Sequence, residues 1–117
     1  MAVTYLITFT LNPGAKPLFL SLLHPVLDAM RHETDFLDAH VSESPDNPDR
    51  LLLLESWADH DAVLAVEIHR PYRKAYHAAL PELLAQPREI SVWRTLRRDS
   101  KKISDDFTAP QQTEPGN

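Results

Sequence analysis

Four consecutive leucines, Leu51 to Leu54, constrain the fold of this chain more than any other feature. Successive side chains of a β-strand point to opposite faces of its sheet, so a strand that contains this run is apolar on both faces. Such strands lie near the centre of a sheet that is covered on both sides. The run therefore predicts a central strand from Leu51 to Trp57, with a layer of structure against each face of the sheet.

Two segments before this strand show clear strand and helix patterns. Residues 3–11 alternate apolar side chains with threonines, and this period of two is typical of a strand. After a turn at "NPGAKP", apolar residues recur at steps of four, three and four, which predicts an amphipathic helix over residues 18–32. Pro25 lies inside this helix and lacks a backbone donor, so we expect a kink or a local break there.

The chain continues this alternation up to about residue 96. The further predicted elements are a strand over residues 36–43, a loop at "SPDNPD", the central strand, a helix capped by Asp59 and ending near Val66, a helix from Pro71 to Leu84, and a strand over residues 89–96. The order is β-α-β-β-α-β, with the second helical region in two parts. It predicts an α+β fold of the ferredoxin-like type, in which helices cover one face of a four-stranded antiparallel sheet.

The length of 117 residues indicates a single domain, which we place at residues 1–97. One face of its sheet would be apolar and bare, beyond what monomers usually tolerate. The simplest second layer is the same face of a second copy, so a homodimer is predicted. Residues 98–117 form a polar tail, in which Ile103 and Phe107 predict an arm that anchors on the partner subunit.

The composition excludes several kinds of function. The chain has no cysteine, which excludes disulfides, thiolate nucleophiles and cysteine zinc sites. Its net charge of −5 argues against nucleic acid or an anionic membrane as a partner. The apolar run at the N-terminus is too short to span a bilayer. With two glycines and no histidines at metal-ligand spacing, neither a nucleotide loop nor a metal site is predicted. We expect a cytoplasmic protein without a bound cofactor.

The candidate site residues begin directly after the leucine run. Glu55 and Trp57 share one strand face, and a carboxylate on a buried face must be hydrogen-bonded or serve acid–base chemistry or binding. His69 is suited to take a proton from a phenol or quinol near neutral pH. Tyr72 and Tyr76, four residues apart, present aromatic faces that could flank a planar ligand. We predict that these five side chains line one shared cavity.

Each of these residues also has a purely structural interpretation. Trp57 could be a large core residue, and Glu55 could hold a backbone amide or an arginine. A histidine such as His69, between two helices, often caps a helix or faces solvent, and the tyrosines could simply pack in the core. Arg73 and His77, also four residues apart, are typical of a solvated helix face.

Three stretches of the chain occur in a recognisable order: "NPGAKPLFLSLLHPVLDAMRHE", "ESWADHDAVLAVEIHRPYRKAY" and "LPELLAQPREISVW". In this order they resemble the antibiotic biosynthesis monooxygenase domain over residues 3–96. The resemblance implies a dimeric α+β barrel. Some members are cofactor-independent oxygenases of quinols or polycyclic aromatics, whereas others degrade haem or isomerise small metabolites. Ile7 stands where haem-degrading relatives have asparagine, and Leu53 stands where polyketide-oxidising relatives have one, so neither residue set is complete here.

The residues and the resemblance together predict a homodimeric enzyme that oxidises an aromatic or quinol-like molecule without a cofactor. In this hypothesis Glu55 and His69 are catalytic and assist deprotonation, while Trp57, Tyr72 and Tyr76 bind the substrate ring. Two alternatives stay open. One is an isomerase or cyclase on a small oxygenated metabolite, with Glu55 and His69 as a proton-transfer pair. The other is a dimer that binds a small hydrophobic ligand without turnover.

Overall fold

The computed structural model of the chain describes residues 1–101. Its elements are β1 (Val3–Thr10), α1 (Lys16–Met30), β2 (Phe36–Ser44), β3 (Asn47–Trp57), α2 (His60–Ala65), the 3-10 turns η1 (Glu67–His69) and η2 (Pro71–Arg73), α3 (Lys74–Leu83) and β4 (Glu89–Arg94). The segment from α2 to α3 forms the second helical region, so the predicted α+β fold of the ferredoxin-like type is confirmed. Over residues 1–101, no helix combines the length and the apolar character that crossing a membrane requires.

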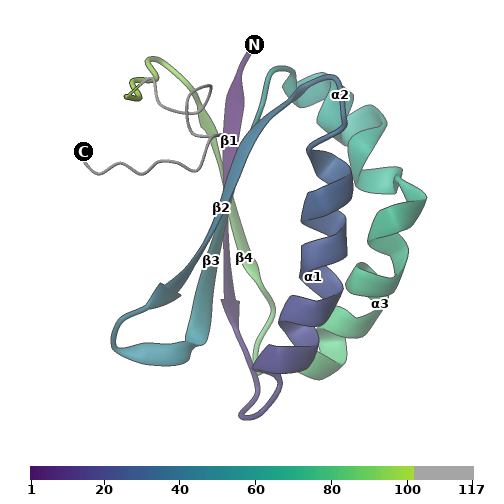
Figure 1. Ribbon diagram of the computed structural model, residues 1–117, viewed down its shortest axis with the longest axis vertical. Helices are drawn as coiled ribbons and strands as arrows, with labels where there is room; N and C mark the ends of the chain where they lie inside the picture. The colour runs from purple at the N-terminus through teal and green to yellow at the C-terminus, as the bar shows by residue number, and fades with distance from the viewer. Residues whose placement is uncertain (102–117) are drawn as a thin grey trace, which may run out of the picture.

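The four strands form one antiparallel sheet in the order β2-β3-β1-β4. The central strands β1 and β3 pair so that Tyr5 lies opposite Glu55 and Val3 lies opposite Trp57. The helices all lie against one face of this sheet (Figure 1). The predicted central position of the leucine-rich strand is therefore confirmed, and the side chains of its Glu55 face point toward the helices.

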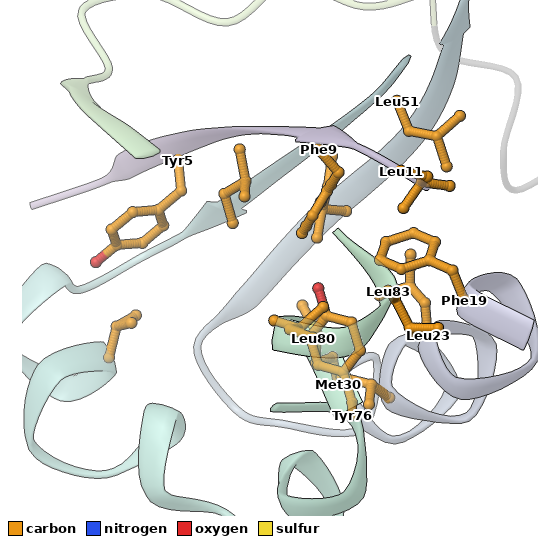
Figure 2. Close-up of a cluster of buried hydrophobic side chains, with 14 of the residues drawn as sticks. Tyr5, Phe9, Leu11, Phe19, Leu23, Met30, Leu51, Tyr76, Leu80 and Leu83 are labelled. Atoms are coloured by element: carbon orange, nitrogen blue, oxygen red, sulfur yellow. The ribbon is translucent and has the colours of Figure 1, made fainter. Parts of the chain in front are cut away.

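The core lies between the sheet and the helical layer (Figure 2). The buried strand residues are Val3, Tyr5, Ile7, Phe9, Leu51, Leu53 and Trp57, and the buried residues of α1 and α3 are Phe19, Leu23, Val26, Met30, Tyr76, Leu80 and Leu83. Phe9 and Phe19 pack across the interface between these layers, with ring centroids 4.9 Å apart. The buried stripe of α1 has the predicted steps of four, three and four, because these positions share one side of a helix.

The opposite face of the sheet carries apolar side chains among threonines, serines and charged residues. It carries Leu6, Leu52 and Leu54, which are half-buried, and Trp93, which exposes 59% of its surface. Within residues 1–101, no helix covers this face (Figure 1). The predicted second layer is therefore not supplied by the described part of the chain. The predicted arm around Ile103 and Phe107 lies outside the described residues.

Several local features bear on the predictions. The N-cap at Asp59 is confirmed, because its side chain accepts a hydrogen bond from the backbone N–H of Asp61 at 3.0 Å. The helix α1 continues without a break through Pro25, which lies on the exposed side, where water can reach the carbonyl group that proline leaves free. The predicted loop "SPDNPD" is mostly strand, because β3 already begins at Asn47 after a turn at residues 45–46. The predicted helix from Pro71 begins with a 3-10 turn.

Candidate functional site

A cavity of about 440 Å³ lies between the sheet and the helical layer. Its walls are mainly apolar, and its polar lining residues are Tyr5, Glu55, His60, His69, Arg73, Tyr76, His77 and Arg88. The lining residues that are also exposed, such as Val92 and Ile68, lie on β4 and on the segment from α2 to η1, so the cavity opens between these elements. An apolar pocket of this size with a few convergent polar groups is typical of a small-molecule site.

The carboxylate of Glu55 is held in place by the indole of Trp57. Glu55 exposes only 5% of its surface, and Trp57 is fully buried. The Nε1–H group of Trp57 donates a hydrogen bond to Oε1 of Glu55 at 2.9 Å. The contact arises because residues two apart on a strand point to the same face. Oε2 of Glu55 makes no hydrogen bond with any residue in the range 1–101, so one carboxylate oxygen stays available on the cavity wall.

The structure brings three of the five candidate residues to one cavity. Glu55, His69 and Tyr76 line it, whereas Trp57 and Tyr72 do not. Trp57 lies behind Glu55 and packs edge-on against Phe36, with ring centroids 5.3 Å apart. The expectation that Trp57 and Tyr72 form the cavity wall therefore does not match the geometry. Both residues instead contact side chains that do line the cavity.

Tyr72 is tied to the end of α1 rather than to the cavity. Its hydroxyl donates a hydrogen bond to Oε2 of Glu33 at 3.0 Å. Burial, together with this bond to Glu33, raises the pKa of Tyr72 to about 12. Glu33 also pairs with Arg70 at 3.2 Å. This cluster joins the turn after α1 to η2 and so positions the residues that follow.

His69 and Tyr76 line the cavity at positions that differ in exposure to solvent. His69 lies at the open side and is exposed. Tyr76 is buried, and Figure 2 shows its hydroxyl pointing from α3 toward the sheet. This hydroxyl has no hydrogen-bond partner among residues 1–101. Burial raises the pKa of Tyr76, although the nearby Arg88 guanidinium opposes the shift. Tyr76 is therefore a neutral hydroxyl with a free donor inside the cavity.

A tyrosine–histidine pair in the cavity was not predicted from the sequence. The hydroxyl of Tyr5 lies 2.6 Å from Nδ1 of His60. Burial and the carboxylate of Glu55 raise the pKa of Tyr5. The two residues are 55 positions apart, and only the register of β1 against β3 and the start of α2 bring them together. The one local signal was the N-cap at Asp59, which places His60 in the first turn of α2.

The prediction of a solvated face for Arg73 and His77 was wrong. Arg73 exposes 6% of its surface, His77 is half-buried, and both line the cavity. The error lies in the choice of stripe, because Arg73 lies three residues before the buried Tyr76 and so shares its side of the helix. The resulting buried stripe consists of Arg73, Tyr76, Leu80 and Leu83. Steps of three, four and three in the sequence could have revealed it.

The guanidinium of Arg73 lies near two aromatic rings. Its Cζ is 6.0 Å from the ring centroid of Trp57 and 5.7 Å from that of Tyr72. Nε and Nη2 are buried and have no hydrogen-bond partner in the described part of the chain. Burial, Arg88 and Arg73 together lower the pKa of His77. In residues 1–101, no group of three or more histidine, cysteine, aspartate or glutamate side chains is arranged to hold a metal ion.

Comparison with known proteins places the chain in a family. The model of the antibiotic biosynthesis monooxygenase family matches residues 2–86. The chain belongs to this family. A curated relative from Pestalotiopsis microspora, named "Putative monooxygenase", is 29% identical over 93 residues, which cover 79% of this chain and 78% of the relative.

Solved structures of other proteins share the fold. A protein from Mycobacterium tuberculosis is 26% identical, with a TM-score of 0.77 and coverage of 86% of this chain and 100% of that one. A point variant of SnoaB, described as a cofactor-independent oxygenase from Streptomyces nogalater, is 18% identical with a TM-score of 0.71. That alignment covers 83% of this chain and 95% of SnoaB, and at this identity it shows the fold alone.

Proposed function

We propose that this protein is a cofactor-independent monooxygenase that oxidises an aromatic or quinol-like molecule in the cavity. Membership of the family and the name of the fungal relative support a monooxygenase-type function. The name of SnoaB supports the cofactor-independent type. The observation that carries the proposal is Glu55, a buried carboxylate that a single indole N–H holds against the wall of a mainly apolar cavity.

The proposed reaction takes all of its electrons from the substrate. A base removes a proton from a phenolic O–H or from the activated CH2 group of its keto form, which leaves an electron-rich anion. The anion reduces O2, a carbon–oxygen bond forms, and protonation gives a hydroperoxide. Loss of water then leaves a carbonyl, so that CH2 and O2 become C=O and H2O. The protein contributes the base, the orientation of the ring and the exclusion of water.

Glu55 is the proposed base, because its free oxygen lies on the cavity wall. Trp57 is then a positioning residue, which fixes the carboxylate through its N–H group. His69 lies at the open side and is the second candidate for proton transfer. Tyr76 offers a neutral hydroxyl that can bind the oxygen of the substrate anion. A lost general base lowers a rate by about 10²–10⁴.

The cavity also agrees with a second class of reaction. Glu55 and His69 line the same space, as a proton-transfer pair for an isomerase or cyclase on a small oxygenated metabolite would. Such an enzyme would move protons without consuming O2. A dimer that only binds a hydrophobic ligand would do neither. Oxygen consumption distinguishes the monooxygenase from both alternatives. Exchange of substrate protons with solvent distinguishes the isomerase or cyclase from the dimer that only binds a ligand.

We also propose that the protein is a homodimer in which two sheets face each other. The sheet face that carries Leu52, Leu54 and Trp93 among polar side chains is covered by no helix of residues 1–101. A second copy of the same face would remove these side chains from water symmetrically. The dimeric α+β barrel implied by the family is the same arrangement.

The experiment measures O2 consumption above the uncatalysed rate with 1,4-naphthoquinol and with anthrone, followed by mass spectrometry of the products formed under ¹⁸O2. We expect one ¹⁸O atom in anthraquinone formed from anthrone. Glu55→Gln should lower the rate by about 10²–10⁴, because glutamine still accepts the bond from Trp57 but is not a base. His69→Ala tests the second candidate, and His32→Ala, a histidine on an exposed turn, is the control. No oxygen uptake with any ring substrate, or a Glu55→Gln variant with full rate, would contradict the proposal.

A further inference from the structure

The guanidinium of Arg73 is enclosed, yet it has no anionic partner within residues 1–101. Arg73 lines the cavity, and its Nε and Nη2 atoms are buried without a hydrogen bond. None of the ion pairs in the described part of the chain includes it. Arginine stays charged in proteins, and enclosed charges are almost always paired. No carboxylate of residues 1–101 pairs with this side chain, so its buried N–H groups are available to an anionic group of a ligand.

Two aromatic rings lie next to this guanidinium. They belong to Trp57 and Tyr72, with centroids 6.0 Å and 5.7 Å from Cζ. Each ring is itself held by a hydrogen bond, from Trp57 to Glu55 and from Tyr72 to Glu33. Contact with ring faces leaves the N–H groups at the edge of the guanidinium available for hydrogen bonds. That edge matches the two oxygens of a planar carboxylate.

The charges around the cavity favour the same kind of group. Arg88 lines the cavity together with Arg73, whereas Glu55 is the only acidic residue among the lining side chains. The whole chain, by contrast, carries a net charge of −5. A positively charged cavity with apolar walls raises the local concentration of an anion that also has an apolar part.

We propose that the ligand of this cavity is an aromatic carboxylate, whose carboxylate group pairs with Arg73 and whose ring lies against the apolar wall formed by β1, β3 and α1. The proposal rests on the proposed function for the aromatic character of the ligand, but it does not depend on a reaction with O2. It also gives a role to Trp57 and Tyr72. Neither residue lines the cavity, and both position the guanidinium that does.

Calorimetric titration with 2-naphthoate and 2-naphthamide tests the pairing, because the two probes share a ring system and differ in charge. We expect the wild-type protein to bind 2-naphthoate at least about tenfold more tightly. Arg73→Met should weaken 2-naphthoate about 10- to 100-fold and leave 2-naphthamide within about threefold. Arg31→Met, the same substitution on the exposed side of the chain, should leave both affinities unchanged. The proposal is overturned if the wild-type protein binds 2-naphthoate no more tightly than 2-naphthamide, or binds neither of them.

A stability measurement distinguishes a ligand-binding arginine from a structural one. Methionine has a similar length and also packs well on aromatic rings, and it removes an enclosed charge that lacks a partner. We therefore expect ligand-free Arg73→Met to unfold at a temperature no lower than the wild-type protein. A clearly lower Tm would indicate a structural role and overturn the proposal. Arg73→Lys keeps the charge but not the planar N–H edge, and it should still lose about tenfold in affinity for 2-naphthoate.

The oxygen assay separates failure of this inference from failure of the proposed function. Selective binding of 2-naphthoate through Arg73, without oxidation of any quinol, would support the carboxylate site and contradict the monooxygenase. The opposite result is also possible. If the protein oxidises 1,4-naphthoquinol and 1,4-dihydroxy-2-naphthoate with equal kcat/KM, and Arg73→Met leaves both values unchanged, the monooxygenase is supported and the carboxylate site is overturned.

Discussion

Replacing Trp57 by phenylalanine tests whether the indole N–H supports Glu55. Trp57 is fully buried, and its Nε1 lies 2.9 Å from Oε1 of Glu55. In Trp57→Phe the buried carboxylate loses the only side-chain hydrogen bond that it makes within residues 1–101. A hydrogen bond to a charged group contributes about 1.5–3 kcal/mol. The smaller ring also leaves an unfilled space that costs about 1 kcal/mol. We expect the free energy of unfolding to fall by about 2.5–4 kcal/mol.

A double-mutant cycle with Glu55→Leu isolates the contribution of the hydrogen bond. Glu55→Leu alone leaves the indole N–H of Trp57 buried without an acceptor, which costs about 1–3 kcal/mol. In the double variant neither polar group remains, so no buried group lacks a partner. Its loss of stability should therefore be smaller than the sum of the two single losses by about 1.5–3 kcal/mol.

The measurement is equilibrium unfolding in urea, followed by circular dichroism in the far ultraviolet because two of the variants lack Trp57. All variants are compared at one protein concentration, since the apparent stability of a dimer depends on it. Equal slopes of free energy against urea confirm that the variants unfold from similar states. The reasoning is refuted if the stability losses of the two single variants add up to that of the double variant within about 0.5 kcal/mol, because residues without coupling behave in this way.

Three other parts of the fold give further expected outcomes. Asp59→Ala should lower the free energy of unfolding by about 1 kcal/mol, because it removes the N-cap of α2, and an unchanged value in urea would show that the cap is not needed. Leu54→Asp, on the uncovered sheet face, should make the protein monomeric in sedimentation, whereas Leu18→Asp, at an exposed position of α1, should leave it dimeric. A Leu54→Asp variant that is still dimeric would exclude this face as the interface. Folding raises the pKa of Tyr72 from 10.0 to about 12, so stability is present below pH 10 and is lost as pH rises toward 12. Tyr72→Phe should lose less stability over that range, and parallel pH curves would contradict this.

The period of each element could be predicted from the sequence, because it is a property of the backbone. Side chains of a strand alternate between faces, so Glu55 and Trp57 were expected on one side of β3, and they lie there. A helix repeats every 3.6 residues, so the spacing from Phe19 to Met30 identified the buried stripe of α1. The N-cap at Asp59 was predictable for a similar reason, since its side chain bonds to a backbone N–H two residues later.

The inward position of Arg73 could have been read from the helix that follows it. Residues 73, 76, 80 and 83 are three, four and three apart, which places them on one side of an α-helix. The contact that holds the start of this helix could not be read in the same way. The turn η2 packs against the end of α1 through Tyr72 and Glu33, 39 residues apart. Sequence patterns within one segment carry no information about such a contact.

Tertiary structure alone decided which residues line the cavity. The sequence determined which side of β3 the Trp57 indole faces, but not how deep it lies, because depth depends on how the helices cross the sheet. Val3 and Phe36 lie opposite Trp57 on the neighbouring strands, and the indole fills the space behind Glu55 instead of lining the cavity. His60 reaches Tyr5 across 55 positions of sequence for the same reason. Local periodicity sets the direction of a side chain, whereas the packing of distant segments sets its neighbours.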